Sequence, residues 1–316
     1  MIIEHDWQTI MKKVCAGKAH EISEGDTMYL AACTKGTNAA SVRKQPFSTV
    51  MAKQRAYSLK SSYMTQILNK YIFGNVKSER VIKSVEKLSK HSFEEYVIGR
   101  IAPFYGKTIS QLRYEFNVTS NAKNSNELIL ARMLGVDGKI SQTEEFKKAG
   151  IIPKTIRVQK NGKIKENMSF PTFDFIELSK EECWEESEFY NYLVPTKFLF
   201  VIFSEQDNDE YILEKSMFWN IPNADLEQVR NVWECTVKTI KSGVILTQTS
   251  RGVSNNFPKK SENPVAHVRP HGKDRNDRLP LPDGRMMMKQ CFWLNNTYIE
   301  SQIGLSSNQS SREQFK

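Results

Sequence analysis

The 316 residues are enough for two ordinary domains, or for one large domain with a substantial addition. With 39% hydrophobic and 26% charged residues the composition is that of a globular protein, and no apolar run approaches the roughly 20 residues of a membrane span. The 45 Lys and Arg against 36 Asp and Glu give a net charge of +9, which favours a polyanionic partner. The start of the chain lacks the pattern of a secretion signal, so a cytoplasmic location is expected.

The first 92 residues are expected to form an all-helical, basic module. Asp6 can cap a helix that runs to about Val14, and residues 47–73 carry apolar side chains at helical spacing. From Thr27 to Ser78 there is no acidic residue, but there are eight cations: Lys35, Arg43, Lys44, Lys53, Arg55, Lys60, Lys70 and Lys77. This stretch is a candidate phosphate-binding face, with an ordinary solvated basic surface as the alternative.

Residues 93–305 have a mixed pattern that predicts an α/β or α+β domain with a mixed central sheet flanked by helices. The elements expected in chain order are a helix at 126–134, a strand at 150–158 with a hairpin partner at 164–170, a buried strand at 197–204 and an amphipathic helix at 225–241. The segment 171–215 holds twelve acidic residues and three Lys, so the chain has an acidic and a basic side. Residues 306–316 are expected to be a disordered tail.

The five cysteines lie far apart, and none has a histidine or a second cysteine at zinc-ligand spacing. A different segment, Glu145 to Lys154, has the spacing of a metal-dependent nuclease motif. Such enzymes place an Asp before a strand with Glu-x-Lys, because alternate strand residues face one side and can share a Mg²⁺ ion and a water. Here the position two residues before Lys154 is Ile152, and Pro153 lies between them.

The run from Glu145 to Val158 resembles the acid-x6-acid-x-Lys motif of the MutH mismatch-repair endonuclease and its restriction-enzyme relatives, which cut at GATC. Other segments are similar to further parts of the MutH domain: residues 105–112, 126–136, 197–205 and 267–271. Segments 17–21, 33–36 and 52–56 resemble the extra helical module in the C-terminal half of Sau-three-A-type restriction endonucleases. The resemblance implies a restriction-endonuclease-like MutH fold that corresponds to the C-terminal, DNA-binding effector half.

The family's metal-binding set falls on Ala131, Glu145, Ile152 and Lys154, so two of three carboxylates are absent. Glu145 and Lys154 are interpreted as remnants of the site, and Glu127, one helical turn before Ala131, is the candidate substitute. No metal and no active catalytic residue is expected.

The resemblance places base-reading residues at Arg269, Pro270 and His271, in the basic stretch 267–289, which is expected to be mostly loop. Trp293 aligns with the aromatic residue that senses adenine methylation in MutH; the alternative is a core tryptophan. Further predicted DNA contacts are Lys273, Lys123, Lys35, Arg43, Lys53 and Arg55.

The leading hypothesis is sequence-specific binding of double-stranded DNA at a GATC-type site by a catalytically impaired effector half of a type II restriction endonuclease. Its expected partner is a separate catalytic MutH-like subunit, and a dimer on DNA is a further option. The alternative is an active endonuclease with Mg²⁺ held by Glu127 and Glu145. A third hypothesis is an inert remnant of a longer gene.

Overall fold

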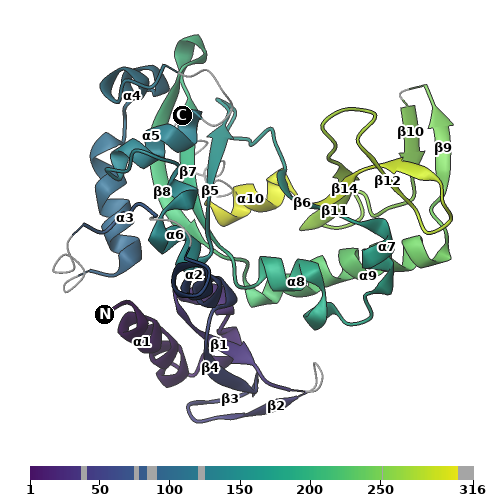
Figure 1. Cartoon of the computed structure of the whole chain (residues 1–316), viewed down its shortest axis with the longest axis horizontal. Helices are drawn as coiled ribbons and strands as arrows, with labels where there is room; N and C mark the ends of the chain where they lie inside the picture. Colours follow the sequence, from purple (N-terminus) through teal and green to yellow (C-terminus); the bar gives the residue numbers. More distant parts are fainter. Residues whose placement is uncertain (37–40, 75–77, 84–90, 120–124, 251, 305–316) are drawn as a thin grey trace, which may run out of the picture. The chain divides into compact units, whose positions relative to one another are not determined.

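The computed structural model describes residues 1–36, 41–74, 78–83, 91–119, 125–250 and 252–304 (Figure 1). Two sequence predictions, Lys123 as a DNA contact and the disordered tail at 306–316, lie outside the described residues. The chain forms two compact units. The first is Met1–Lys160 with Tyr192–Asn223, and the second is Asn161–Asn191 with the chain from Ala224 onward.

The N-terminal part of the first unit is not all-helical, so this prediction is wrong. Two antiparallel strand pairs lie between α1 (Ile2–Cys15) and α2 (Ser61–Tyr71) in the chain. They are β1 (Leu30–Thr34) with β4 (Arg55–Leu59), and β2 (Val42–Gln45) with β3 (Ser48–Lys53). Where a helix was expected from residue 47, strand β3 begins at Ser48 after the tight turn at Pro46-Phe47, and its β-branched residues Thr49 and Val50 favour an extended backbone. The helix begins only at Ser61, after the strand β4 has ended.

Asp6 is an interior residue of α1 and not its N-cap, because the helix already begins at Ile2. Its carboxylate is buried and accepts hydrogen bonds from the backbone N–H groups of Met28 (2.7 Å), Tyr29 (2.7 Å) and Leu30 (2.9 Å). These bonds satisfy donors at the start of β1 and fasten it to the helix.

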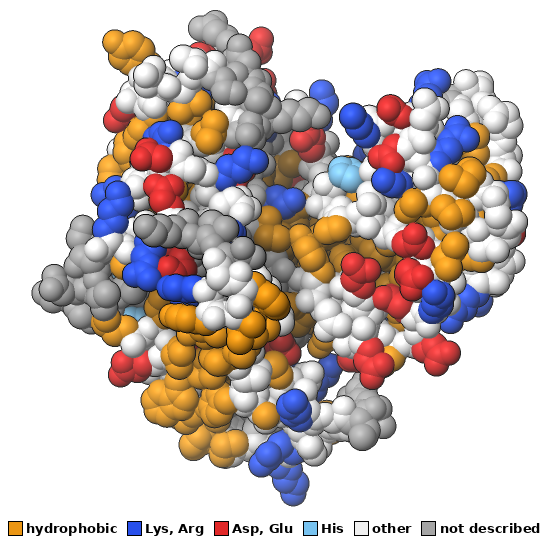
Figure 2. Space-filling view, in the orientation of Figure 1, with side chains coloured by type: hydrophobic (Ala, Val, Ile, Leu, Met, Phe, Trp, Pro, Cys, Tyr) orange, Lys and Arg blue, Asp and Glu red, His pale blue; other side chains and the backbone are white. Residues whose placement is uncertain are grey.

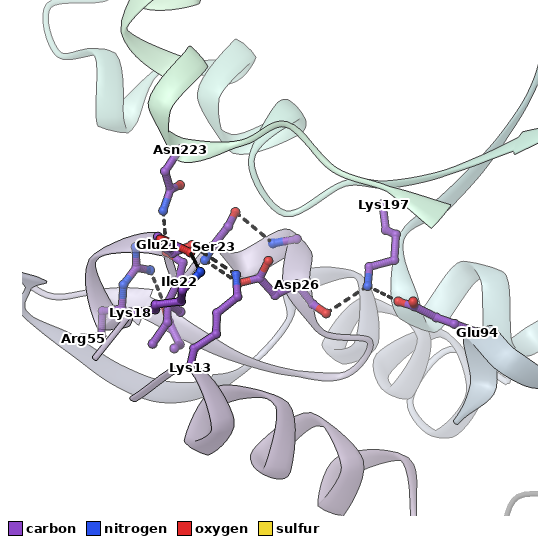
Figure 3. Close-up of polar contacts among 12 residues, drawn as sticks. Lys13, Lys18, Glu21, Ile22, Ser23, Asp26, Arg55, Glu94, Lys197 and Asn223 are labelled. Carbon is purple, nitrogen blue, oxygen red and sulfur yellow. Dashed lines mark hydrogen bonds and ion pairs between the residues drawn. The ribbon is translucent and has the colours of Figure 1, made fainter. Parts of the chain in front are cut away.

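Polar contacts also fasten this N-terminal part to the sheet of the first unit (Figure 3). The buried Lys197 amine donates to the carbonyl of Asp26 (2.9 Å) and pairs with Glu94. The Asn223 amide donates to the carbonyl of Ile22 at 2.6 Å. The first 92 residues therefore belong to a larger compact unit, and the predicted boundary at residue 92 is not where the two units divide.

The first unit contains a mixed three-stranded sheet in the order β5-β7-β8. Strand β5 (Ile151–Val158) runs parallel to β7 (Lys197–Glu205), which is antiparallel to β8 (Tyr211–Trp219). The predicted central strand is confirmed as β7, since its residues 197–203 are all buried. The predicted hairpin from residue 150 to 170 is wrong: β5 pairs in parallel with β7, and the expected partner segment forms β6 (Met168–Phe173), which pairs with β14 (Gln290–Leu294) in another sheet.

Helices α3 (Phe93–Ile101), α4 (Ile109–Glu115), α5 (Ser125–Met133) and α6 (Glu144–Ala149) contribute to one core with this sheet. The prediction of a helix at 126–134 is confirmed by α5. Its buried side chains meet Leu199 and Val201 of β7, while Phe93 and Phe146 meet edge to face at 6.2 Å. The apolar face of each helix thus covers one face of the sheet.

The second unit is built on an antiparallel sheet in the order β11-β14-β6: β11 (Ala266–Pro270), β14 (Gln290–Leu294) and β6 (Met168–Phe173). It also has two hairpins, β9 (Leu246–Thr249) with β10 (Gly252–Asn255) and β12 (Arg278–Pro280) with β13 (Met286–Met288). Its helices are α7 (Phe175–Lys180), α8 (Glu188–Leu193, which ends in the first unit), α9 (Leu226–Ser242) and α10 (Asn296–Gln302). The predicted amphipathic helix is confirmed by α9.

Together the two units are a mixed arrangement of helices and several small sheets, as the predicted α/β or α+β class requires. Among the described residues, no helix is long and apolar enough to cross a membrane.

Candidate functional site

The nuclease-like motif begins in the first turn of α6 and continues into β5. Gly150 ends the helix with a left-handed φ of 64°, which glycine adopts without strain, and the strand begins at the next residue. Glu145 therefore lies on a helix, while Ile152 and Lys154 lie two apart on the same side of a strand.

Glu145 has a structural role that the sequence did not reveal. Its side chain is buried, and its two oxygens accept hydrogen bonds from the backbone N–H groups of Val81 (3.0 Å) and Ile82 (3.2 Å). Both oxygens are thus engaged with a chain segment more than sixty residues earlier. Removing this carboxylate would leave two backbone donors without their acceptor.

Glu144, the neighbouring carboxylate, belongs to an ion-pair cluster on the other side of α6. It pairs with Lys148 (2.6 Å), Arg80 (2.7 Å) and Lys70 (3.6 Å). Burial alone would raise the pKa of Glu144, but the hydrogen bonds from Lys148 and Arg80 lower it to about 2. It serves as an anion held by cations.

The other positions of the predicted metal set do not supply a site. Ala131 is fully buried in α5, and Ile152 is apolar. Glu127, the candidate substitute, accepts hydrogen bonds from the backbone N–H and the hydroxyl of Ser141. Mg²⁺ needs several oxygen ligands, and the residues at these positions do not fit it. Among the described residues, no group of three or more His, Cys, Asp and Glu could hold a metal ion.

Lys154 lies half-buried on β5, opposite Phe200 of β7 in the parallel register. Ile152 lies opposite Phe198 on the same side. This side of the sheet carries a row of aromatic rings, since Phe200 stacks on Trp219 of β8 at 5.2 Å. Ala131, in contrast, belongs to the core on the other side of the sheet, with Leu199.

In the second unit the predicted DNA-reading residues Arg269, His271 and Trp293 lie together, at the end of β11 and on the neighbouring strand β14. The guanidinium carbon of Arg269 lies 5.5 Å from the centre of the Trp293 ring, and the indole N–H donates to the Arg269 carbonyl at 3.2 Å. The His271 ring meets Trp293 edge to face at 5.1 Å. Arg269 and His271 are exposed and Trp293 is half-buried, so the three form a surface cluster of one cation and two rings.

A buried polar network, which sequence reasoning missed, supports this cluster. His267 lies opposite Trp293 in the strand register, and its Nδ1 lies 2.6 Å from Oδ1 of Asn295. Burial lowers the pKa of His267, and the charge of Arg269 lowers it further, although the bond to Asn295 acts in the other direction. Asn295 in turn donates to the carbonyl of Asn263 at 2.8 Å. Two asparagines so far apart in sequence give no local pattern from which this network could be predicted.

Arg269 and Pro270 end the edge strand β11, and are not loop residues as expected. Pro270 fits there because an edge strand tolerates a missing backbone donor. The loop begins at His271. Lys273 is exposed, and its backbone N–H donates to the carboxylate of Asp277 (2.9 Å), which also pairs with Lys289 at 2.7 Å.

The predicted basic face divides into exposed and engaged residues. Lys35, Arg43, Lys44 and Lys53 are exposed around β2 and β3. Arg55 is half-buried and donates to the carbonyl of Ala32 at 2.6 Å, and Lys70 pairs with Glu144. Lys60 is buried, with its amine 3.0 Å from the carbonyl of Pro195, so it does not belong to the face.

One comparison with known proteins supports the resemblance to a Sau-three-A-type restriction endonuclease. The chain is 38% identical over 341 aligned positions to the type II restriction enzyme Sau3AI of Staphylococcus aureus, a match that covers 96% of this chain and 70% of that enzyme. No family model matches. The matched share exceeds one half of the relative, so the assignment of this chain to the C-terminal half stays a prediction. At this identity and coverage, the chain belongs to the Sau3AI family of type II restriction enzymes.

Proposed function

We propose that this chain binds duplex DNA at a GATC-type site through a MutH-like scaffold and does not cut it. The absence of cleavage is inferred from the buried, hydrogen-bonded carboxylate of Glu145. The one carboxylate kept from the predicted metal set is buried and bonded through both oxygens to the backbone at Val81 and Ile82. With Ala131 and Ile152 in the other two places, Mg²⁺ would have little besides water to hold it.

The proposed base-reading surface is the cluster of Arg269, His271 and Trp293. An arginine can donate two hydrogen bonds to the major-groove edge of guanine, and Trp293 limits where the guanidinium can lie. The indole N–H is already bonded to the Arg269 carbonyl, which leaves the ring to make an apolar contact, as with a thymine methyl or a methylated adenine. Lys273, in the loop that Asp277 holds, would contact a phosphate.

A separate subunit with an intact set of metal-binding carboxylates is the partner that this proposal implies. Membership of a restriction-enzyme family supports it, since restriction requires cleavage and the carboxylates needed for it are missing at the aligned positions. In that arrangement this chain acts as the effector half, which binds a copy of the site and supports cleavage by the partner.

The test is a gel-shift and cleavage assay of the purified chain with duplexes that carry GATC, methylated GATC or a scrambled site, each with and without Mg²⁺. We expect salt-sensitive binding that prefers GATC and no product in Mg²⁺. Cleavage that disappears in Lys154→Ala would overturn the proposal in favour of an active endonuclease. Equal affinity for the scrambled duplex would remove the site specificity.

A further inference from the structure

The tip of the β2–β3 hairpin presents an aromatic ring to solvent. Gln45 pairs with Ser48, so Pro46 and Phe47 form a two-residue turn between the strands. The Phe47 side chain is 62% exposed, although phenylalanine side chains are most often buried. A ring displayed at the end of a narrow two-stranded ribbon calls for an explanation in terms of what it contacts.

The backbone of this tip is held in place while the ring points outward. The Gln45 side chain is buried; it accepts from the backbone N–H of Ala19 (3.0 Å) and donates to the carbonyl of Val50 (2.7 Å). On the other side, Gly17 has a φ of +70°, and a Cβ added there would lie 2.5 Å from the Phe47 carbonyl oxygen. The tip therefore packs on the segment after α1, and the exposed Phe47 side chain projects from a backbone that these contacts hold in place.

The sides of the same ribbon are cationic. Arg43 and Lys44 on β2 and Lys53 on β3 are exposed, and no acidic residue occurs between Thr27 and Ser78 to offset them. In Figure 2, hydrophobic and basic side chains occur together over the region that β1–β4 occupy in Figure 1. A two-stranded ribbon is narrow enough to enter a DNA groove, and its cations would lie beside the phosphates.

We propose that the β2–β3 ribbon is a second DNA-contacting element, and that Phe47 inserts between two base pairs as a wedge and bends the duplex. This rests on the proposed binding of duplex DNA and adds a mode of contact to it. Proteins that bend DNA insert apolar side chains such as Phe or Pro between base steps, and the unstacking is offset by the wider contact that the bend permits. The exposed cations beside Phe47 favour DNA over a protein partner, because charged residues are depleted at the centre of protein–protein interfaces whereas phosphates attract them.

The proposal is tested with a 30-base-pair GATC duplex that carries 2-aminopurine at successive positions beside the site and a donor and acceptor dye at its ends. With the wild-type chain we expect a rise in 2-aminopurine fluorescence at one step outside the site, where stacking is lost, and an increase in energy transfer from the bend. Phe47→Ala should abolish both signals and weaken binding about tenfold, within the range for removing one stacking aromatic side chain. Phe47→Leu should retain part of both, because leucine is also a wedge residue.

Phe73→Ala is the matched control, since Phe73 is 65% exposed but follows α2 and is not part of the ribbon. It should leave affinity, fluorescence and bend unchanged. Lys53→Ala should weaken binding and keep the bend of the bound complex, because it removes a phosphate contact and leaves the wedge.

The outcomes distinguish a failure of the wedge proposal from a failure of the proposed DNA binding. If the wild type discriminates GATC but neither bends nor unstacks the duplex, the wedge is wrong and specific binding stands. If Phe47→Ala bends DNA as the wild type does, the wedge is also wrong. If Phe47→Ala instead changes the molar mass measured by light scattering, Phe47 is a contact between protein chains, and the proposal fails. If the wild type binds no duplex, both proposals fail together.

Discussion

Two adjacent carboxylates show how the position of a side chain decides its role. Glu144 is held by cations at the surface of α6, and Glu145 caps the backbone at Val81 and Ile82 from the buried side of the same helix. The motif spacing predicted a remnant metal ligand at Glu145. It could not predict the two backbone donors, because they come from a segment whose approach only the tertiary structure defines.

Glu145→Gln should lower the free energy of unfolding by about 1–3 kcal/mol, because an amide keeps one acceptor oxygen for two buried backbone donors. Urea denaturation followed by tryptophan fluorescence measures this change. Glu182→Gln is the control, since Glu182 is exposed, and it should stay within about 0.5 kcal/mol of the wild type. A Glu145→Gln protein as stable as the wild type would contradict the capping role.

Lys60 makes stability depend on pH. Burial, assisted by the charge of Lys197, lowers the pKa of Lys60 to about 7, while in the unfolded chain it is about 10.4. Between these values the unfolded chain binds more protons, so the free energy of unfolding should rise with pH from about 7 to 10. Lys60→Met should remove this contribution, and denaturation midpoints at pH 7 and pH 9 compare the two proteins. An identical pH dependence in both would show that Lys60 is not the source.

Arg269→Ala should reduce the preference for GATC over a scrambled duplex, because the proposed bidentate contact to guanine accounts for about 1–3 kcal/mol of discrimination. Competition binding at fixed salt measures the ratio of the two affinities. Lys273→Ala, a few residues further along, should weaken both duplexes alike and leave the ratio unchanged. If the two variants behave alike, Arg269 contacts only the backbone of DNA.

At the scale of elements, Gly17 lies just after α1 and packs against the tip of the β2–β3 ribbon. Gly17→Ala should displace the hairpin tip, because the new Cβ would lie 2.5 Å from the Phe47 carbonyl oxygen. We expect a loss of the DNA bend with the GATC preference intact, measured by the energy-transfer assay. Gly162→Ala is the matched control: its φ of +74° imposes similar strain, but no atom lies within 4 Å of the added Cβ. If both variants bend DNA equally, the tip does not depend on this packing.

The sequence predicted correctly the elements whose own apolar pattern specifies a helix or a strand. It did not predict the elements whose structure depends on the strand with which they pair. Strand β7 has a continuous apolar run of six residues, Phe198–Phe203, and helix α9 keeps its amphipathic pattern over 17 residues. In contrast, the residues from Phe47 to Leu59 fit helical spacing as well as they fit strands, and only pairing with β1 and β2 decides between the two. The turn at Asn161-Gly162 likewise gave no sign that β5 pairs with β7.

For the whole molecule, the uneven charge along the chain predicts a particular response to salt. If the basic N-terminal face contacts phosphates, the dissociation constant should rise steeply with salt, as bound counterions are released. Lys53→Ala should lower the slope of log Kd against log salt by about 1. Lys180→Ala is the control, because Lys180 is exposed within the acidic segment 171–215 and pairs with Glu177; it should keep the wild-type slope. Equal slopes would remove the N-terminal face from the proposed interface.

If the chain does not cut DNA, as proposed, the capping role of Glu145 bears on what restoring a metal site would require. Acidic substitutions at Ala131 and Ile152 would complete the motif in sequence. The Glu145 carboxylate would still accept hydrogen bonds from the backbone N–H groups of Val81 and Ile82. A metal could recruit Glu145 only by releasing that segment from the core. A designed metal site at these positions would thus need a replacement acceptor for the backbone N–H groups of residues 81–82 before Glu145 could serve as a ligand.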